Sequence, residues 1–222
     1  MPNRPIHVHI QELSQVLVDL SSSVVENLSD ALYAVKYQDK DSVPRIKAAE
    51  NELEIEEIDI EERCIQFIAL QHPVAKDLRT ILAVMMMSDE LEHIGEISLN
   101  IIDSMFAITP AMLELLEFEL MFTLASDMVK KSIDAFVLHD RHLADRVCAQ
   151  DNEVDAMHHT AINKVTALMK TADADVNQLI NALSVSRNIE RVADHASKIA
   201  QEVIYLVTGE LVKQKGFHHD FL

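Results

Sequence analysis

The chain has 222 residues, of which 49% are hydrophobic and 5% aromatic, and its three glycines and five prolines are too few for collagen, low-complexity disorder or a turn-rich β-sandwich. Its 37 acidic residues against 19 basic ones give a formal net charge of −18 at pH 7. Because binding to a nucleic-acid backbone requires a basic surface, this balance excludes nucleic acid as a partner and favours metal cations or basic protein surfaces.

Breaks in the sequence divide the chain into six long segments, and the abundance of Leu, Ala, Met and Glu within them predicts an all-α fold. Pro44, Pro73 and Pro110 lie at three of the breaks, and the polar segments 139–141 and 171–175 mark two more. Helices are expected at residues 8–38, 43–71, 74–107, 110–139, 142–170 and 175–208, each about 45 Å long at the rise of an α-helix.

The six expected helices are two copies of a three-helix unit. At an offset of 101 residues Glu50 matches Asp151, and from the third helix onward the offset is 98, so that Glu92 matches Glu190. Because short connections place neighbouring helices antiparallel, we expect two tandem three-helix bundles. The expected limits are residues 1–108 for the first bundle, 109–210 for the second and 211–222 for a C-terminal tail.

Acidic residues gather on one side of four of these helices. Eight of the thirteen residues from 50 to 62 are acidic. At about 100° per residue, those at positions 54, 57 and 61 fall within about 40° of Glu50, along the line that continues through Cys64, Ile65 and Ile68. These carboxylates are therefore expected to extend the core-facing stripe. Acidic pairs of this kind are Glu50/Glu54, Glu92/Glu96, Asp151/Asp155 and Glu190/Asp194.

Such carboxylates need compensation, because like charges repel at this spacing and burying them unpaired costs several kcal/mol. Of the basic residues only Arg187 and Arg191 lie near the acidic stripes. A multivalent cation would compensate, since carboxylates from facing helices supply hard oxygen ligands. The alternative is that the stripes open to water at the end of each bundle and bind nothing.

Several segments resemble the PhoU family. Residues 190–195 (ERVADH), continued by residues 199–210, resemble the closing helix of PhoU proteins. Residues 73–79 (PVAKDLR) resemble the turn into their third helix, and residues 92–96 (EHIGE) resemble the first copy of their acidic signature. The resemblance spans roughly residues 10–210 and includes the duplication.

The resemblance implies a cytoplasmic, non-enzymatic regulator of phosphate homeostasis. PhoU proteins damp the high-affinity phosphate ABC transporter, whose ATPase they contact, and convey its state to a phosphate sensor histidine kinase. They are usually homodimers associated peripherally with these membrane complexes, and several carry multinuclear clusters of iron, zinc or another divalent metal. The clusters lie on E/D-x-x-x-D signatures, which map here to the same eight residues: Glu50, Glu54, Glu92, Glu96, Asp151, Asp155, Glu190 and Asp194.

The two repeats differ within this signature. The first contains Glu96 where the family usually has Asp, and Asp89 is answered by Arg187, so the two sites are expected to differ in charge. Of the candidate histidine ligands, His158 is the best, because it replaces Glu57 on the acidic stripe; a hydrogen-bonded interior histidine explains it equally well. The others are His93, His159 and His195, with His218 and His219 in the tail.

Two further classes of protein remain open. A di-iron carboxylate enzyme requires Glu-x-x-His on two helices, and residues 90–93 supply one such pattern while residues 155–158 are only a near match. A metal-free assembly module is the other. No nucleophile–base arrangement or glycine-rich phosphate loop is present, which argues against direct catalysis. The absence of an apolar signal segment, and the two cysteines Cys64 and Cys148, predict a soluble protein in a reducing compartment.

Overall fold

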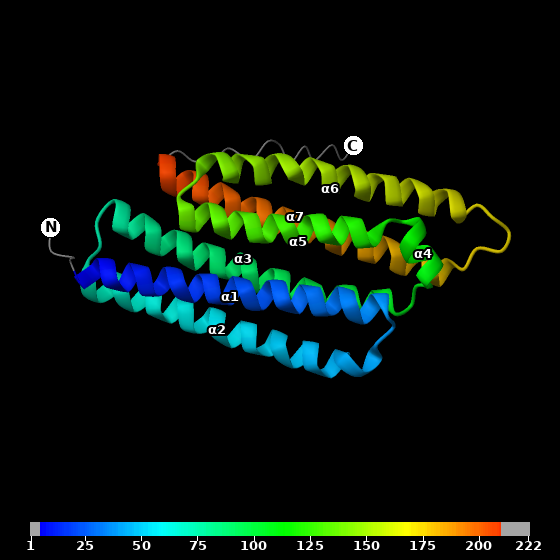
Figure 1. Cartoon of the computed structure of the whole chain (residues 1–222), viewed down its shortest axis with the longest axis horizontal. Helices are drawn as coiled ribbons and strands as arrows, with labels where there is room; N and C mark the ends of the chain where they lie inside the picture. Colours follow the sequence, from blue (N-terminus) through cyan, green and yellow to red (C-terminus); the bar gives the residue numbers. More distant parts are fainter. Residues whose placement is uncertain (1–4, 210–222) are drawn as a thin grey trace, which may run out of the picture.

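The computed structural model describes residues 5–209, and this part of the chain consists of helices without any strand (Figure 1). The prediction of an all-α fold is confirmed. The elements are α1 (Pro5–Lys36), a 3-10 turn (Lys40–Ser42), α2 (Val43–Gln71), α3 (Lys76–Met105), α4 (Pro110–Leu115), α5 (Phe118–Leu138), α6 (Arg141–Leu168) and α7 (Val176–Thr208). None of the helices in this range combines the length and the apolar character needed to cross a membrane.

The fourth predicted helix, residues 110–139, is interrupted, whereas the other five begin and end within three residues of their expected limits. The break lies at Glu117, whose φ of +57° is left-handed. Its neighbours Leu116 and Phe118 are both buried, at 4% and 0% exposure. On a continuous helix these two side chains would point about 160° apart, so both can reach the core only because the chain turns between them.

Aspartates begin the two long helices of the second repeat. The side chain of Asp140 accepts a hydrogen bond from the backbone N–H of Leu143 at 3.1 Å, and that of Asp175 accepts one from Gln178 at the same distance. Each satisfies a backbone donor that the first helical turn leaves free. At the other end, α7 stops at Gly209, whose φ of +74° suits glycine at a helix C-terminus.

The two three-helix groups lie side by side, with α3 and α7 in the centre of the molecule (Figure 1). The hydroxyl oxygens of Ser104 and Ser184 lie 3.3 Å apart, and Nζ of Lys198 lies 3.3 Å from Oε2 of Glu90. From the first contact to the second, the residue number falls by 14 on α3 and rises by 14 on α7, so these two helices are antiparallel. One hydrophobic core of buried residues runs through both repeats.

An approximate two-fold axis relates the repeats. In the register of α3 against α7, Gly95 lies opposite Ala193, and these two residues also match in the sequence repeat. Both are buried. A Cβ atom added at Gly95 would lie 3.1 Å from Cδ1 of Leu53, so glycine is what allows α2 to approach α3 closely beside the axis.

Candidate functional site

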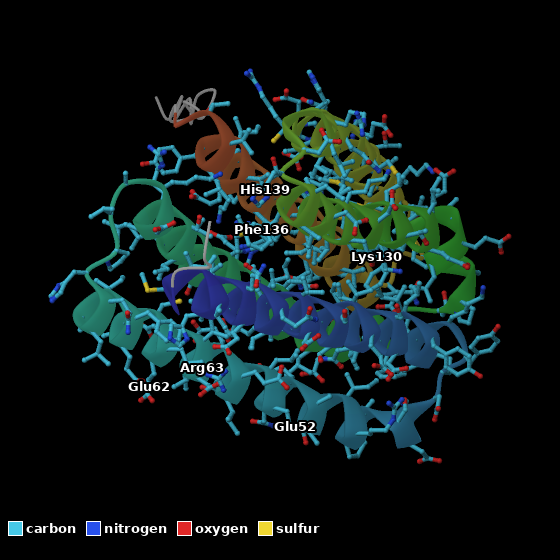
Figure 2. All side chains as sticks on the ribbon, turned by 60° about the vertical axis from the view of Figure 1, so that its left-hand side comes forward. Glu52, Glu62, Arg63, Lys130, Phe136 and His139 are labelled. Carbon is cyan, nitrogen blue, oxygen red and sulfur yellow. The ribbon has the colours of Figure 1, made fainter. Side chains whose placement is uncertain are left out.

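The acidic residues of α2 lie at the edge of its buried face, not along its centre. The buried residues of this helix are Ile46, Leu53, Ile60 and Cys64. Leu53 points about 60° away from Glu50, so Glu50 is half-buried while Glu54, on the far side, is exposed. The expectation that these acids extend the core-facing stripe is therefore wrong by about 60°. Other acids, including Glu52 and Glu62, project from the outer side of the helix (Figure 2).

In the first repeat, the four carboxylates of the predicted signature share one neighbourhood between α2 and α3. Burial raises the pKa of Glu50, and the charges of Glu54, Glu92 and Glu96 raise it further. Glu50 and Glu92 are half-buried, whereas Glu54 and Glu96 are exposed. This first cluster is therefore open to solvent on one side.

The second cluster lies between α6 and α7 and consists of Asp151, Asp155, Glu190 and Asp194, all half-buried. Burial and the charges of Asp194 and Asp155 raise the pKa of Asp151 to about 7. Burial, Asp194 and Asp155 likewise raise that of Glu190 to about 7. In addition, Oδ1 of Asp151 is enclosed and has no hydrogen-bond partner. The protein therefore offers the ionised carboxylates of the second cluster too little positive charge and too few hydrogen bonds to offset their burial and mutual repulsion.

The donor chemistry of the second cluster fits a divalent cation, although its oxygens do not converge. Within residues 5–209, no three side chains of His, Cys, Asp or Glu stand close enough together to hold a metal ion. Repulsion between like charges favours this separation. Carboxylate oxygens are the ligands that hard cations prefer, and the unpartnered Oδ1 of Asp151 is free to serve as one.

His158 lies on the same side of α6 as the second cluster. Its Nδ1 is 2.8 Å from the hydroxyl of Ser186 on α7, and its ring is half-buried. Burial and the neighbouring His159 lower the pKa of His158. The side chain is therefore a hydrogen-bonded interior histidine that stays neutral near pH 7, and a neutral imidazole is also the form that binds metals.

An ionic cluster between α3 and α7 was not anticipated from the sequence. Oε2 of Glu90 lies 2.5 Å from Nδ1 of His195 and 3.3 Å from Nζ of Lys198. Burial raises the pKa of Glu90, but the hydrogen bonds and charges of these partners outweigh it and lower the pKa. In the sequence repeat, Glu90 is matched by Asn188 and Lys198 by Asn100, so the ionic cluster has no counterpart on the other side of the two-fold axis. The signal that the sequence offered was a histidine at position 195, among the small and apolar residues of the last helix, and the structure shows that this position is buried.

The Glu-x-x-His pattern at residues 90–93 is divided between two sets of partners. Glu90 bonds to α7, whereas Nδ1 of His93 lies 2.6 Å from Oε2 of the adjacent Glu92. The rings of His93 and His195 meet edge to face with centroids 5.5 Å apart. A di-iron site requires the glutamate and histidine to ligate together, which this arrangement does not favour. The predicted candidates His218 and His219 lie outside the described residues.

Comparison with known proteins decides the family. The family model of the PhoU domain matches residues 17–105 and again residues 118–203. The chain belongs to the PhoU family. One relative is the phosphate-specific transport system accessory protein PhoU homolog 1 of Thermotoga maritima, which is 28% identical over 94% of this chain and 93% of its own length.

Solved PhoU structures share the fold. The phosphate transport system regulatory protein PhoU from Streptococcus pneumoniae superposes with a TM-score of 0.86 at 26% identity, covering 93% of this chain and 99% of that one. PhoU from Pseudomonas aeruginosa gives a TM-score of 0.83 at 26% identity, over 92% of this chain and 99% of its own. The resemblance read from the acidic signatures and the duplication is thereby confirmed, and these relatives are named as accessory or regulatory proteins of phosphate transport.

Proposed function

We propose that this PhoU protein is a cytoplasmic, non-enzymatic regulator that lowers high-affinity phosphate uptake and phosphate-starvation signalling. The observation that carries the proposal is the match of both repeats to the PhoU domain, over nearly the length of relatives named as accessory proteins of phosphate transport. Its partners would be the ATPase of the phosphate ABC transporter and a sensor histidine kinase, and it would act as a homodimer. The acidic surface implied by a net charge of −18 suits basic patches on such partners.

We further propose that the two carboxylate clusters bind divalent metal, with iron the leading candidate. Support comes from the second cluster, where Asp151 and Glu190 both have a pKa raised to about 7 and Oδ1 of Asp151 has no partner. A bound cation would supply positive charge that favours the ionised carboxylates and holds α6 against α7. The residues that would hold it are the four acids of each cluster.

Phosphate uptake in a deletion strain tests the regulatory proposal. Cells lacking this protein, grown with ample phosphate, should take up radiolabelled phosphate faster than the parent and should express a phosphate-starvation reporter. A plasmid copy of the gene should restore both to the parental level. Unchanged uptake and unchanged reporter expression in the deletion strain would contradict the proposed regulation.

Metal content of matched variants tests the clusters. The double variant Glu190→Gln/Asp194→Asn removes two charges from the second cluster, and the control Glu52→Gln/Glu62→Gln removes two from the outer face of α2. After treatment with a chelator, each protein is titrated with Fe²⁺ under anaerobic conditions and with Mn²⁺. The first variant should bind less metal per chain than the wild type and the control. Equal binding by all three proteins would place metal elsewhere.

A further inference from the structure

We propose that the outer face of α2 is a docking surface for a helix of another protein, one with apolar residues at heptad spacing and Lys or Arg beside them. The inference rests on the proposed regulatory function, because a non-enzymatic regulator acts through protein contacts. It names a surface and a partner chemistry for one such contact, and it does not depend on metal binding.

A second apolar stripe runs along α2, opposite the one that faces the core. This outer stripe consists of seven exposed positions at alternate intervals of three and four residues: 48, 51, 55, 58, 62, 65 and 69. Three of them are isoleucines with large exposed fractions, which are 67% for Ile55, 49% for Ile58 and 53% for Ile65. At about 100° per residue, these three side chains point between about 120° and 160° away from the buried Leu53.

The fold itself does not require the outer stripe to be apolar. At the sequence offset of 101, α6 takes the place of α2 in the second repeat, and the matching positions of α6 are also exposed. Ala156, His159 and Thr166 stand there in place of the three isoleucines. The buried positions, by contrast, are apolar in both helices, as Leu53 and its match Val154 show. The isoleucines of α2 therefore serve something other than the core.

The spacing of the outer stripe indicates a helical occupant. Intervals of three and four residues are those by which helices pack in a coiled coil, where each apolar side chain enters a hole formed by four residues of the partner. The stripe runs from position 48 to position 69, over about 32 Å at the helical rise. Exposed apolar surface gathered on one face commonly marks a contact between proteins.

The charges around the outer stripe specify a basic partner. Glu52 lies along one edge of the stripe and Glu61 along the other, Glu62 lies within it, and all three side chains are exposed. Figure 2 shows Glu52 and Glu62 projecting from the outer side of the helix. The three basic residues of α2 already pair with aspartates. Lys or Arg beside the apolar residues of a partner helix would pair with these glutamates.

A second copy of this chain is a poor occupant of the same surface. A two-fold interface brings one patch against itself, so Glu62 and the flanking acids of one copy would face those of the other. Like charges brought together in an interface weaken binding. The anionic surface of a membrane would repel the same acids. A basic amphipathic helix matches both the apolar stripe and the charges beside it.

Site-specific photocross-linking tests the surface. The cross-linking amino acid p-benzoylphenylalanine is placed at Ile58 in the full-length protein and, as a control, at His159, the matching position on α6. Each protein is irradiated in living cells of the deletion strain, and the cross-linked peptides are identified by mass spectrometry. Position 58 should capture another protein at least about tenfold more than position 159 does, at a segment with the expected apolar spacing and basic flanks.

Four results of this experiment would overturn the proposal. They are capture of a second copy of the chain, capture of residues 210–222 of the same chain, capture of a segment that lacks the apolar and basic pattern, and equal yields at the two positions.

Charge reversal tests the chemistry of the partner. Glu52→Lys/Glu61→Lys, in the protein with the cross-linker at position 58, should reduce capture at least about tenfold. Asp134→Lys/Glu153→Lys is the control, because it changes the net charge by the same amount at exposed positions of the second repeat, and it should leave capture unchanged. Undiminished capture by the first variant would overturn the assignment of a basic partner.

A variant of the stripe separates this inference from the regulatory function on which it rests. Ile55→Ser/Ile58→Ser/Ile65→Ser should fold as the wild type does, because all three side chains are exposed, and circular dichroism of the purified protein checks this. In the deletion strain it should fail to lower phosphate uptake. Uptake lowered as far as by the wild type would overturn the inference. If the wild-type gene itself does not lower uptake, the regulatory function fails, and cross-linking alone decides the surface.

Discussion

Replacing Asp151 by asparagine should stabilise the metal-free protein, and the gain should grow with pH. Burial and the charges of Asp194 and Asp155 raise the pKa of Asp151 from 3.8 to about 7. The folded state therefore holds this proton more tightly than the unfolded chain does. The contribution of this one group to stability is therefore most favourable below about pH 4, and it is lost as pH rises through about 7, above which the carboxylate is ionised in both states.

The size of the effect follows from the same values. A pKa raised from 3.8 to about 7 corresponds to a loss of about 4 kcal/mol once the folded-state carboxylate is ionised. The side chain is only half-buried, so solvent screening lowers this value, and Glu190 competes for the same proton. We therefore expect Asp151→Asn to raise the free energy of unfolding by about 2 kcal/mol at about pH 8 and by little at about pH 4.

Urea unfolding followed by far-UV circular dichroism, with a chelator present, measures this difference. Glu153→Gln, which removes one charge from the exposed side of α6, controls for the general benefit of reducing a net charge of −18. A gain of equal size at both pH values would mean that hydrogen bonding or packing, not the buried charge, distinguishes the two side chains. No gain at about pH 8 would refute the electrostatic reasoning.

Three further predictions concern other parts of the molecule. Gly95→Val should lower the free energy of unfolding by about 2 kcal/mol, because the Cβ alone would lie 3.1 Å from Cδ1 of Leu53 and valine adds two methyl groups to it. A variant as stable as the wild type in urea would show that α2 can move aside. Glu90→Ala should lower the free energy of unfolding by about 3 kcal/mol, because it leaves His195 buried without its carboxylate. The loss should be smaller in acid, where the wild-type carboxylate is protonated, and a pH-independent loss of under about 1 kcal/mol would contradict this. Glu117→Gly should raise the melting temperature by a few degrees, equivalent to about 1 kcal/mol, because glycine adopts the left-handed backbone of this position without strain. A lower melting temperature would mean that the contacts of the Glu117 side chain stabilise the protein by more than the backbone strain costs.

Sequence periodicity misjudged the direction in which the acidic residues of α2 point. The apolar line through Cys64, Ile65 and Ile68 included a residue that is 53% exposed, Ile65, and so tilted the inferred buried face toward the carboxylates. The helix has isoleucines on several sides, four of them partly or largely exposed, and periodicity cannot tell which ones a neighbouring helix will cover. Packing against α1 and α3 selects the face centred near Leu53.

Residue type and spacing within single segments were enough to predict the helical composition and the duplication, which the structure and the family match confirm. The same kind of pattern picked out the eight signature acids, and their role as metal ligands stays a prediction. Tertiary structure decided what depends on contacts between segments. The break at Glu117 exists because Leu116 and Phe118 both enter one core. The pairing of Glu90 with His195 exists because α3 and α7 pack antiparallel, and no spacing along one helix encodes that register.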